Sequence, residues 1–209
     1  MSPFALSHSL FGHIEVICGP MFSGKTEELI RRVKRAQIAR QRVQIFKPKI
    51  DDRYHEENVV SHSAQSIQAK PIDKSTDILE HLYDSTRVVA IDEVQFFDED
   101  VILVVKKLVR RGIRVILAGL DQDYRGIPFG PIPHLMAIAD RVDKVQAICT
   151  VCGGAATKSF RKVLEDEGQV LVGETDIYEA RCGNHFEYQI DEELVSLRPK
   201  SEPVEEVTV

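Results

Sequence analysis

Residues 19–26 of this 209-residue chain match the phosphate-loop pattern G-x-x-x-x-G-K-[ST]; they are Gly19, Pro20, Met21, Phe22, Ser23, Gly24, Lys25 and Thr26. The glycines allow a tight turn that brings backbone N–H groups close to phosphate oxygens. In such loops the lysine reaches the β- and γ-phosphates and the threonine hydroxyl ligates Mg²⁺. Residues 13–18 are predicted to form a strand and residues 27–40 a helix, so the helix N-terminus would face the anion. The stretch therefore predicts an α/β domain that binds a nucleoside triphosphate with magnesium.

Helices and strands are predicted to alternate along the next hundred residues, which indicates a mainly parallel sheet. The apolar runs predict strands at 42–46, 87–91 and 113–118, and a last core strand at 142–148. Helices are predicted at 76–83 and 98–111, with Asp98 as the N-cap of the second helix and Gly112 at its C′ position. Residues 47–68, with a short strand at 59–60, and residues 119–133 are predicted to be loops.

Composition narrows the class of protein. A hydrophobic content of 43% is enough for a globular core, and no run approaches the roughly 20 apolar residues of a membrane span. The net charge of −6 argues against a general nucleic-acid binder held by phosphate contacts. The first residues lack a basic segment followed by a long apolar one, and the four cysteines do not form a disulfide pattern. These features favour a cytoplasmic protein that binds neither membrane nor nucleic acid.

An acidic pair, Asp92-Glu93, follows the predicted strand 87–91. Open α/β sheets place their active sites at the carboxyl ends of strands, so the pair is expected beside the phosphate loop. Asp92 would hold Mg²⁺ together with Thr26. Glu93 could accept a proton from an attacking oxygen. The pair alone leaves the acceptor open: an ATPase would activate water, and a kinase would activate a bound hydroxyl.

A second set of residues has the spacing of a zinc site. It comprises Cys149, Cys152, Cys182 and His185, in the order C-x₂-C and C-x₂-H with 29 residues between the pairs. Thiolate and imidazole ligands in this arrangement suit a tetrahedral Zn²⁺. Because the protein supplies all four ligands, the site would be structural. Cys18, at the end of the first strand, is expected to be a buried free thiol.

Three segments are predicted along the chain. Residues 1–148 would form the nucleotide-binding α/β domain, and residues 149–190 a zinc-binding lobe with short strands and recurrent glycines. Residues 191–209 are acidic and contain proline, which predicts a disordered tail.

Four stretches in this order resemble the cellular-type (type II) thymidine kinases: GPMFSGKT at 19–26, IDEVQFF at 91–97, AGLDQDYRGIPFG at 118–130, and the cysteine pairs. The resemblance extends from about residue 12 to residue 188. It implies a RecA-like core, a small zinc lobe and a lasso-like loop that closes over the nucleoside. It also implies transfer of the ATP γ-phosphate to the 5′-hydroxyl of thymidine.

The resemblance also implies roles for single residues. Glu93 would be the general base, and Val94 and Gln95 would belong to the block that meets the nucleotide. Arg53 would contact the phosphates. The nucleoside pocket would be lined by Met21, Phe96, Leu120, Tyr124 and Phe129. The lasso would contribute Gln169, Val170, Leu171, Val172 and Gly173, whose backbone reads the thymine edge, followed by Tyr178. Family members are typically homotetramers that thymidine triphosphate inhibits by feedback.

Two other functions share some of these motifs. A nucleic-acid-directed ATPase with a zinc ribbon would also need a phosphate loop and an acidic pair, but the negative charge disfavours it. A nucleotide-binding regulator without catalysis would not need an intact Lys25, Thr26, Asp92 and Glu93.

Overall fold

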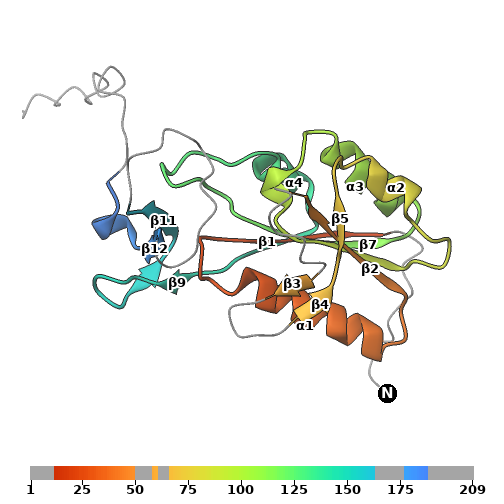
Figure 1. Ribbon diagram of the computed structural model, residues 1–209, viewed down its shortest axis with the longest axis horizontal. Coiled ribbons are helices and arrows are strands. Elements are labelled where there is room, and N and C mark those ends of the chain that lie inside the picture. Colours follow the sequence, from red (N-terminus) through yellow and green to blue (C-terminus); the bar gives the residue numbers. More distant parts are fainter. Residues whose placement is uncertain (1–11, 50–57, 61–65, 163–176, 188–209) are drawn as a thin grey trace, which may run out of the picture.

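The computed structural model describes residues 12–49, 58–60, 66–162 and 177–187 (Figure 1). Its centre is a six-stranded sheet in the order β5-β2-β6-β7-β1-β8, with every neighbouring pair parallel. The six strands are β1 (Ile14–Cys18), β2 (Val43–Pro48), β5 (Lys70–Ile72), β6 (Val88–Ile91), β7 (Arg114–Gly119) and β8 (Arg141–Lys144). The predicted α/β class with a mainly parallel sheet is confirmed.

The central strands are continuous apolar runs because both faces of the sheet are covered. Alternate residues of β7 enter different cores: Val115 and Leu117 face one, and Ile116 and Ala118 face the other. β1, β6 and β7 are buried along most of their length. The centre of the sheet is therefore the rigid base on which the loops at its carboxyl edge stand.

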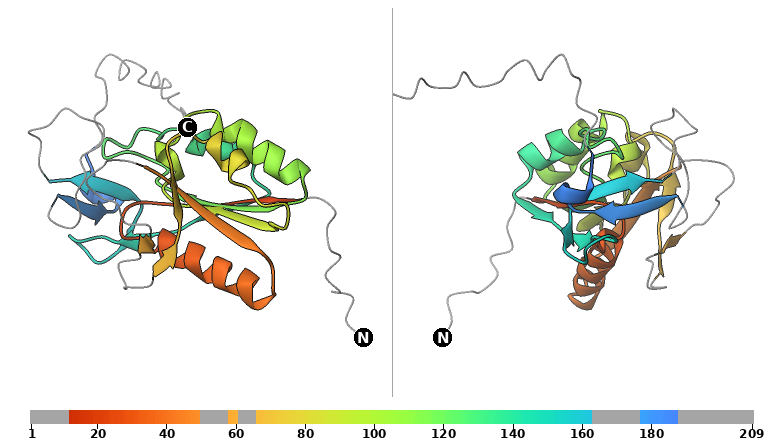
Figure 2. Two further views of the ribbon diagram at one scale, coloured as in Figure 1. Left: turned by 45° about the vertical axis from the view of Figure 1, so that its right-hand side comes forward. Right: turned by 90° about the vertical axis from the view of Figure 1, so that its left-hand side faces the viewer.

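Helices form a layer on each face, as Figures 1 and 2 show. They are α1 (Lys25–Ile38), α2 (Asp77–Glu80), α3 (Val101–Arg110) and α4 (Ile132–Ile138). α1 covers one face with the apolar stripe Leu29, Ile30, Val33 and Ala36. The other three helices contribute to the larger core on the opposite face. None of the helices in the described ranges combines the length and the apolar character that crossing a membrane requires.

Three small two-stranded antiparallel sheets lie outside the central sheet. They pair β3 (Asn58–Val60) with β4 (Ser66–Gln68), β9 (Ala147–Ile148) with β10 (Ala155–Ala156), and β11 (Lys158–Arg161) with β12 (Tyr178–Arg181). The last two sheets lie together at one end of the molecule, seen at the left of Figure 1. We call this end, with β9, β10, β11 and β12, the small lobe.

The predicted core strand at 142–148 is wrong in two respects. Residues 141–144 form β8 at the edge of the central sheet, where Val142 is 39% exposed, and residues 147–148 belong to the small lobe. The chain has to leave the sheet between these strands, because β9 pairs with β10. A run of apolar residues does not reveal such a change of partner.

Several predicted boundaries also move. α1 begins at Lys25, two residues before the predicted start, and α2 is only one turn long. α3 begins at Val101 with Asp100 as its N-cap residue, and the Asp98 carboxylate accepts hydrogen bonds from Ser75 and from the backbone N–H of Asp100. Gly112 does follow the helix with a φ of 75°. α4 and β5 were not predicted, because segments of seven and three residues are too short to show a clear helix or strand period.

Some predictions fall on other parts of the chain. Arg53, the lasso residues 169–173 and the tail 191–209 lie outside the described residues.

Candidate active site and metal centre

Residues 19–24 turn sharply between β1 and α1 at the carboxyl edge of the sheet. Gly19 and Gly24 have φ values of 144° and 80°, in the region that favours glycine. A Cβ on Gly19 would lie 2.3 Å from the carbonyl oxygen of Val145, so the backbones approach too closely for any side chain. α1 begins at Lys25, directly after Gly24, which places its free N–H groups at the loop. This geometry suits an anion-binding turn.

The Lys25 side chain is buried within this loop, and its ammonium donates to the carbonyl oxygen of Pro20 at 2.7 Å. Burial lowers the pKa of Lys25, while the charges of Glu93 and Asp92 oppose that shift. The cation therefore stands next to the acidic pair at the end of β6. Ser23 donates to the same carbonyl at 2.7 Å and tightens the turn.

The Thr26 hydroxyl donates to Asp92 Oδ2 at 3.2 Å. Asp92 is 4% exposed, and burial together with the charge of Glu93 raises its pKa to about 7. A hydroxyl and a carboxylate oxygen this close are suitable oxygen ligands for a small hard cation. The structure thus brings together the two side chains that the sequence predicted as magnesium ligands.

Glu93 follows Asp92 in the left-handed backbone region, with a φ of 52°. Its carboxylate oxygen Oε2 accepts a hydrogen bond from Gln95 Nε2 at 2.5 Å. Val94 and Gln95 lie in a 3₁₀ turn, η1 (Val94–Phe96), where both side chains are buried. The Val94 side chain packs in the larger core. Non-glycine residues with positive φ are uncommon and cluster at functional sites.

Aromatic residues predicted for the nucleoside pocket lie on two neighbouring segments. The rings of Phe96 and Phe129 meet edge to face, with centroids 5.5 Å apart. Tyr124 lies in the loop after β7, with the Arg161 guanidinium 4.1 Å and the Arg125 guanidinium 5.5 Å from its ring centroid. The backbone N–H of Leu120 donates to Gln95 Oε1 at 3.0 Å. Tyr178 lies opposite Arg161 in the small lobe and is 7% exposed.

The small lobe contacts both loops of the site. Ser159 Oγ accepts a hydrogen bond from the backbone N–H of Met21 at 3.0 Å, and Lys158 donates to Gln122 Oε1 at 2.6 Å. Phe22 packs against the core of this lobe. Sequence reasoning missed Lys158, Ser159 and Arg161, because nothing in their order marks them as neighbours of residues 19–26.

Asp121 was also missed. It is 6% exposed, follows β7 and forms an ion pair with Lys144 Nζ at 2.6 Å. Asp92 and Asp121 share one sequence feature, because each is an aspartate that follows an apolar strand. The criterion that predicted Asp92 as a site residue therefore applies to Asp121 as well.

A buried ion network anchors α1 beneath the loop. Arg32 is 4% exposed and pairs with Glu15 at 2.6 Å, Asp143 at 2.7 Å and Glu28 at 2.8 Å. Burial disfavours the charged form of Glu15, but hydrogen bonds and charges from Arg114 and Arg32 outweigh it and lower its pKa. A hydrogen bond from Arg31 is the main cause that lowers the pKa of Glu28 to about 2. The network ties together β1, α1 and β8.

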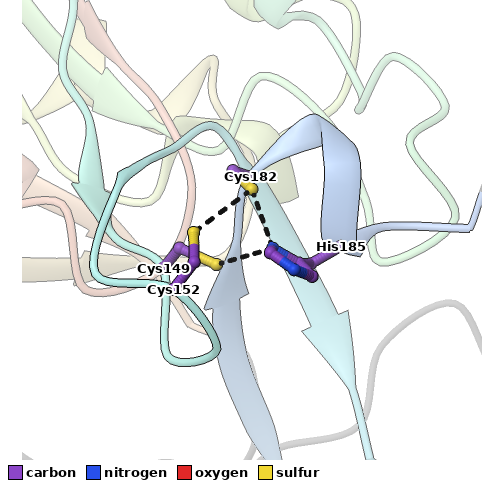
Figure 3. Close-up of side chains that lie close together, drawn as sticks. All are labelled: Cys149, Cys152, Cys182 and His185. Carbon is purple, nitrogen blue, oxygen red and sulfur yellow. Dashed lines mark hydrogen bonds between the residues drawn. The ribbon is translucent and has the colours of Figure 1, made fainter.

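The predicted zinc ligands converge in the small lobe, where Figure 3 shows their side chains pointing toward one another. Their potential ligand atoms all lie within 4.8 Å of each other. Cys152 Sγ and Cys182 Sγ are 3.8 Å apart, and His185 Nδ1 lies 3.2 Å from Cys182 Sγ and 3.7 Å from Cys149 Sγ. A tetrahedron with Zn–S bonds of about 2.3 Å has sulfur–sulfur edges of about 3.8 Å. The four side chains therefore fit a zinc ion.

Local backbone structure favours the thiolate form of Cys149, while the pKa of Cys152 is raised beside it. Gly153, with a φ of 72°, closes a tight turn in which its N–H donates to the Cys149 carbonyl at 2.8 Å. Backbone N–H groups, chiefly that of Cys182, lower the pKa of Cys149 to about 6. A thiolate is the form that binds zinc, so this environment favours the ligand state.

A parallel sheet with a glycine-rich turn after β1 and a buried aspartate after β6 is the architecture of an α/β phosphotransferase. The comparison with known families agrees: the family model described as thymidine kinase matches residues 12–186. The chain belongs to the thymidine kinase family, and it is a phosphotransferase that acts on thymidine.

Proposed function

We propose that the protein transfers the γ-phosphate of ATP to the 5′-hydroxyl of thymidine, giving thymidine monophosphate for DNA-precursor salvage. The observation that carries this proposal is the 3.2 Å contact between Thr26 and Asp92, next to the buried Lys25. It supports a site in which a triphosphate with its magnesium lies between loop 19–26 and the end of β6.

In this site Lys25 and backbone N–H groups of residues 22–26 would bind the β- and γ-phosphates. Thr26 and Asp92 would hold Mg²⁺, which would supply positive charge beside the phosphates. The thymidine 5′-oxygen forms a bond to the γ-phosphorus as the bond from that phosphorus to the β,γ-bridging oxygen breaks, and ADP leaves. Glu93 accepts the proton of the 5′-hydroxyl. We propose Arg53, Val94 and Gln95 as further residues of the nucleotide side.

The nucleoside would bind between the aromatic segments. Met21, Phe96, Leu120, Tyr124, Phe129 and Tyr178 would line its pocket, and the backbone of residues 169–173 would pair with the polar edge of thymine. We divide the chain into a nucleotide-binding domain at 1–148, a zinc lobe with its lasso at 149–190, and a disordered tail at 191–209.

The Cys149, Cys152, Cys182 and His185 site is proposed to bind a structural zinc ion, because the protein fills all four positions. The lobe contacts the phosphate-loop turn through Ser159 and Met21, so the metal would stabilise one wall of the active site. By family likeness we also propose a cytoplasmic homotetramer that is inhibited by thymidine triphosphate and binds neither nucleic acid nor membrane.

The test is an assay of Mg-ATP with thymidine, other nucleosides, or single-stranded DNA. We expect ADP release that depends on thymidine and yields the 5′-monophosphate. Release of free phosphate stimulated by DNA would contradict the proposal in favour of a nucleic-acid-directed ATPase. Tight ATP binding without turnover would contradict it in favour of a regulator.

A further inference from the structure

The Gln95 amide connects two segments of the candidate site. Its side chain, in a residue only 2% exposed, donates from Nε2 to Glu93 Oε2 at 2.5 Å and accepts at Oε1 from the Leu120 N–H at 3.0 Å. The two partners determine which way the amide points. Since the Leu120 N–H can only donate, the oxygen must face it, and the NH₂ group then faces the carboxylate.

Two glycines allow the chain to pack closely against Gln95. A Cβ on Gly119 would lie 2.5 Å from Gln95 Oε1 and 2.9 Å from Ile132 Cδ1. A Cβ on Gly130 would lie 2.3 Å from the carbonyl oxygen of Gln95, and the φ of Gly130 is 49°. Gly119 is the last residue of β7, and Gly130 lies in the loop after it. Because neither has a side chain, this segment can pack directly against Gln95.

Glu93 needs an external restraint on its side chain. Its backbone is in the left-handed region, and its carboxylate is partly exposed. Within the described ranges, Gln95 is the one side chain that hydrogen-bonds this carboxylate. A general base must keep its orientation relative to the attacking oxygen, because a displacement of about 1 Å can cost about 10²-fold in rate.

We propose that Gln95 is a positioning residue: it orients the Glu93 carboxylate for proton abstraction and anchors it to the Leu120 backbone in the loop that carries Tyr124 and Phe129. The inference rests on the proposed role of Glu93 as the base. It adds an action through Glu93, toward the nucleoside, to the place of Gln95 on the nucleotide side of the site.

The first experiment compares Gln95→Met with Gln44→Met. Methionine keeps the length of the side chain and removes both hydrogen bonds. The Gln44 amide also makes two hydrogen bonds, donating to the His81 carbonyl and accepting from the Tyr83 N–H. It lies near the start of β2, at the end of the strand away from the site. Both variants should lower Tm. Gln95→Met should also lower kcat about 10- to 100-fold with a KM for ATP within about twofold, whereas Gln44→Met should retain kcat.

The second experiment is a double-mutant cycle with Glu93→Gln. If Gln95 acts through Glu93, Gln95→Met should not lower the residual turnover of Glu93→Gln any further. An equal loss in both backgrounds, or a kcat of Gln95→Met within about twofold of wild type, would overturn the inference while leaving the base role intact. Near-normal turnover of Glu93→Gln itself would instead remove the proposed base.

Gly119→Ala provides an independent test, because it retains the Gln95 amide. The added methyl group would lie 2.5 Å from Gln95 Oε1 and would displace it. We expect the same selective loss of kcat in the fraction that folds, measured by active-site titration. A folded Gly119→Ala enzyme with wild-type kcat would count against the positioning role.

Discussion

The Thr26 hydroxyl donates to Asp92 Oδ2 at 3.2 Å, across 66 positions of the sequence. Thr26 stands in the first turn of α1, after β1, and Asp92 follows β6. β7 lies between these two strands in the sheet. The contact therefore depends on the strand order and not on local sequence.

This contact leads to a prediction about magnesium. Asp92→Asn should raise the Mg²⁺ concentration needed for half-maximal rate by at least about 10-fold, because a neutral amide is a weaker ligand for a hard cation. The measurement is the initial rate across a magnesium titration at fixed ATP. Asp100→Asn, at an exposed carboxylate next to α3, is the matched control and should leave the titration unchanged. An unchanged titration for Asp92→Asn would exclude Asp92 as a ligand.

Glu93→Gln should reduce kcat by about 10² to 10⁴-fold, since the amide cannot accept the proton of the 5′-hydroxyl. The dissociation constant for ATP should change little, because the carboxylate acts on the acceptor. Single-turnover rates and equilibrium ATP binding measure the two effects separately. Glu99→Gln, an exposed carboxylate on the segment before α3, serves as control and should behave like wild type.

The cysteine cluster predicts metal-dependent stability. The purified protein should contain about one zinc ion per chain, and a strong chelator should lower its Tm. Cys152→Ser should lose zinc, while Cys18→Ala, at a buried thiol outside the cluster, should keep it. Elemental analysis and thermal unfolding provide the measurements. Full zinc content in Cys152→Ser would show that the metal binds elsewhere.

The ion network around Arg32 predicts acid sensitivity. Glu15, Glu28 and Asp143 have lowered pKa values in the folded state, so their contribution to stability is present above the pKa of the unfolded chain. It is lost as pH falls through the folded values, for Glu28 between about 4.5 and about 2. Tm should therefore fall across this range.

Arg32→Met should lower the free energy of unfolding at pH 7 by about 3 kcal/mol, because it removes the buried cation that Glu15, Glu28 and Asp143 share. It should also flatten the dependence of Tm on pH in the acid range. Arg31→Met removes an exposed partner of Glu28 and should lower the free energy of unfolding by much less. Equal losses in the two variants would show that the buried contacts of Arg32 stabilise the fold no more than an exposed ion pair does.

Local chemistry made much of the site predictable. The turn at 19–24 has glycine at two of its positive-φ positions, 19 and 24, and a cysteine pair with two residues between its members needs a tight turn, so both features can be recognised from short stretches of sequence. Strand 88–91 was predictable because a fully buried parallel strand is a continuous apolar run. The same criterion failed at 142–148, where an apolar run changes from the central sheet to the small lobe.

The α/β class, the glycine-rich turn, the acidic pair and the four potential zinc ligands could be predicted from the residues alone, because each is marked by short local patterns. The folded chain was needed to show that β7 separates the two halves of the site, that Ser159 binds the backbone of Met21, and that Gln95 connects Glu93 to Leu120. Those contacts join distant segments, and their partners are selected by strand order and by the space that Gly119 and Gly130 leave.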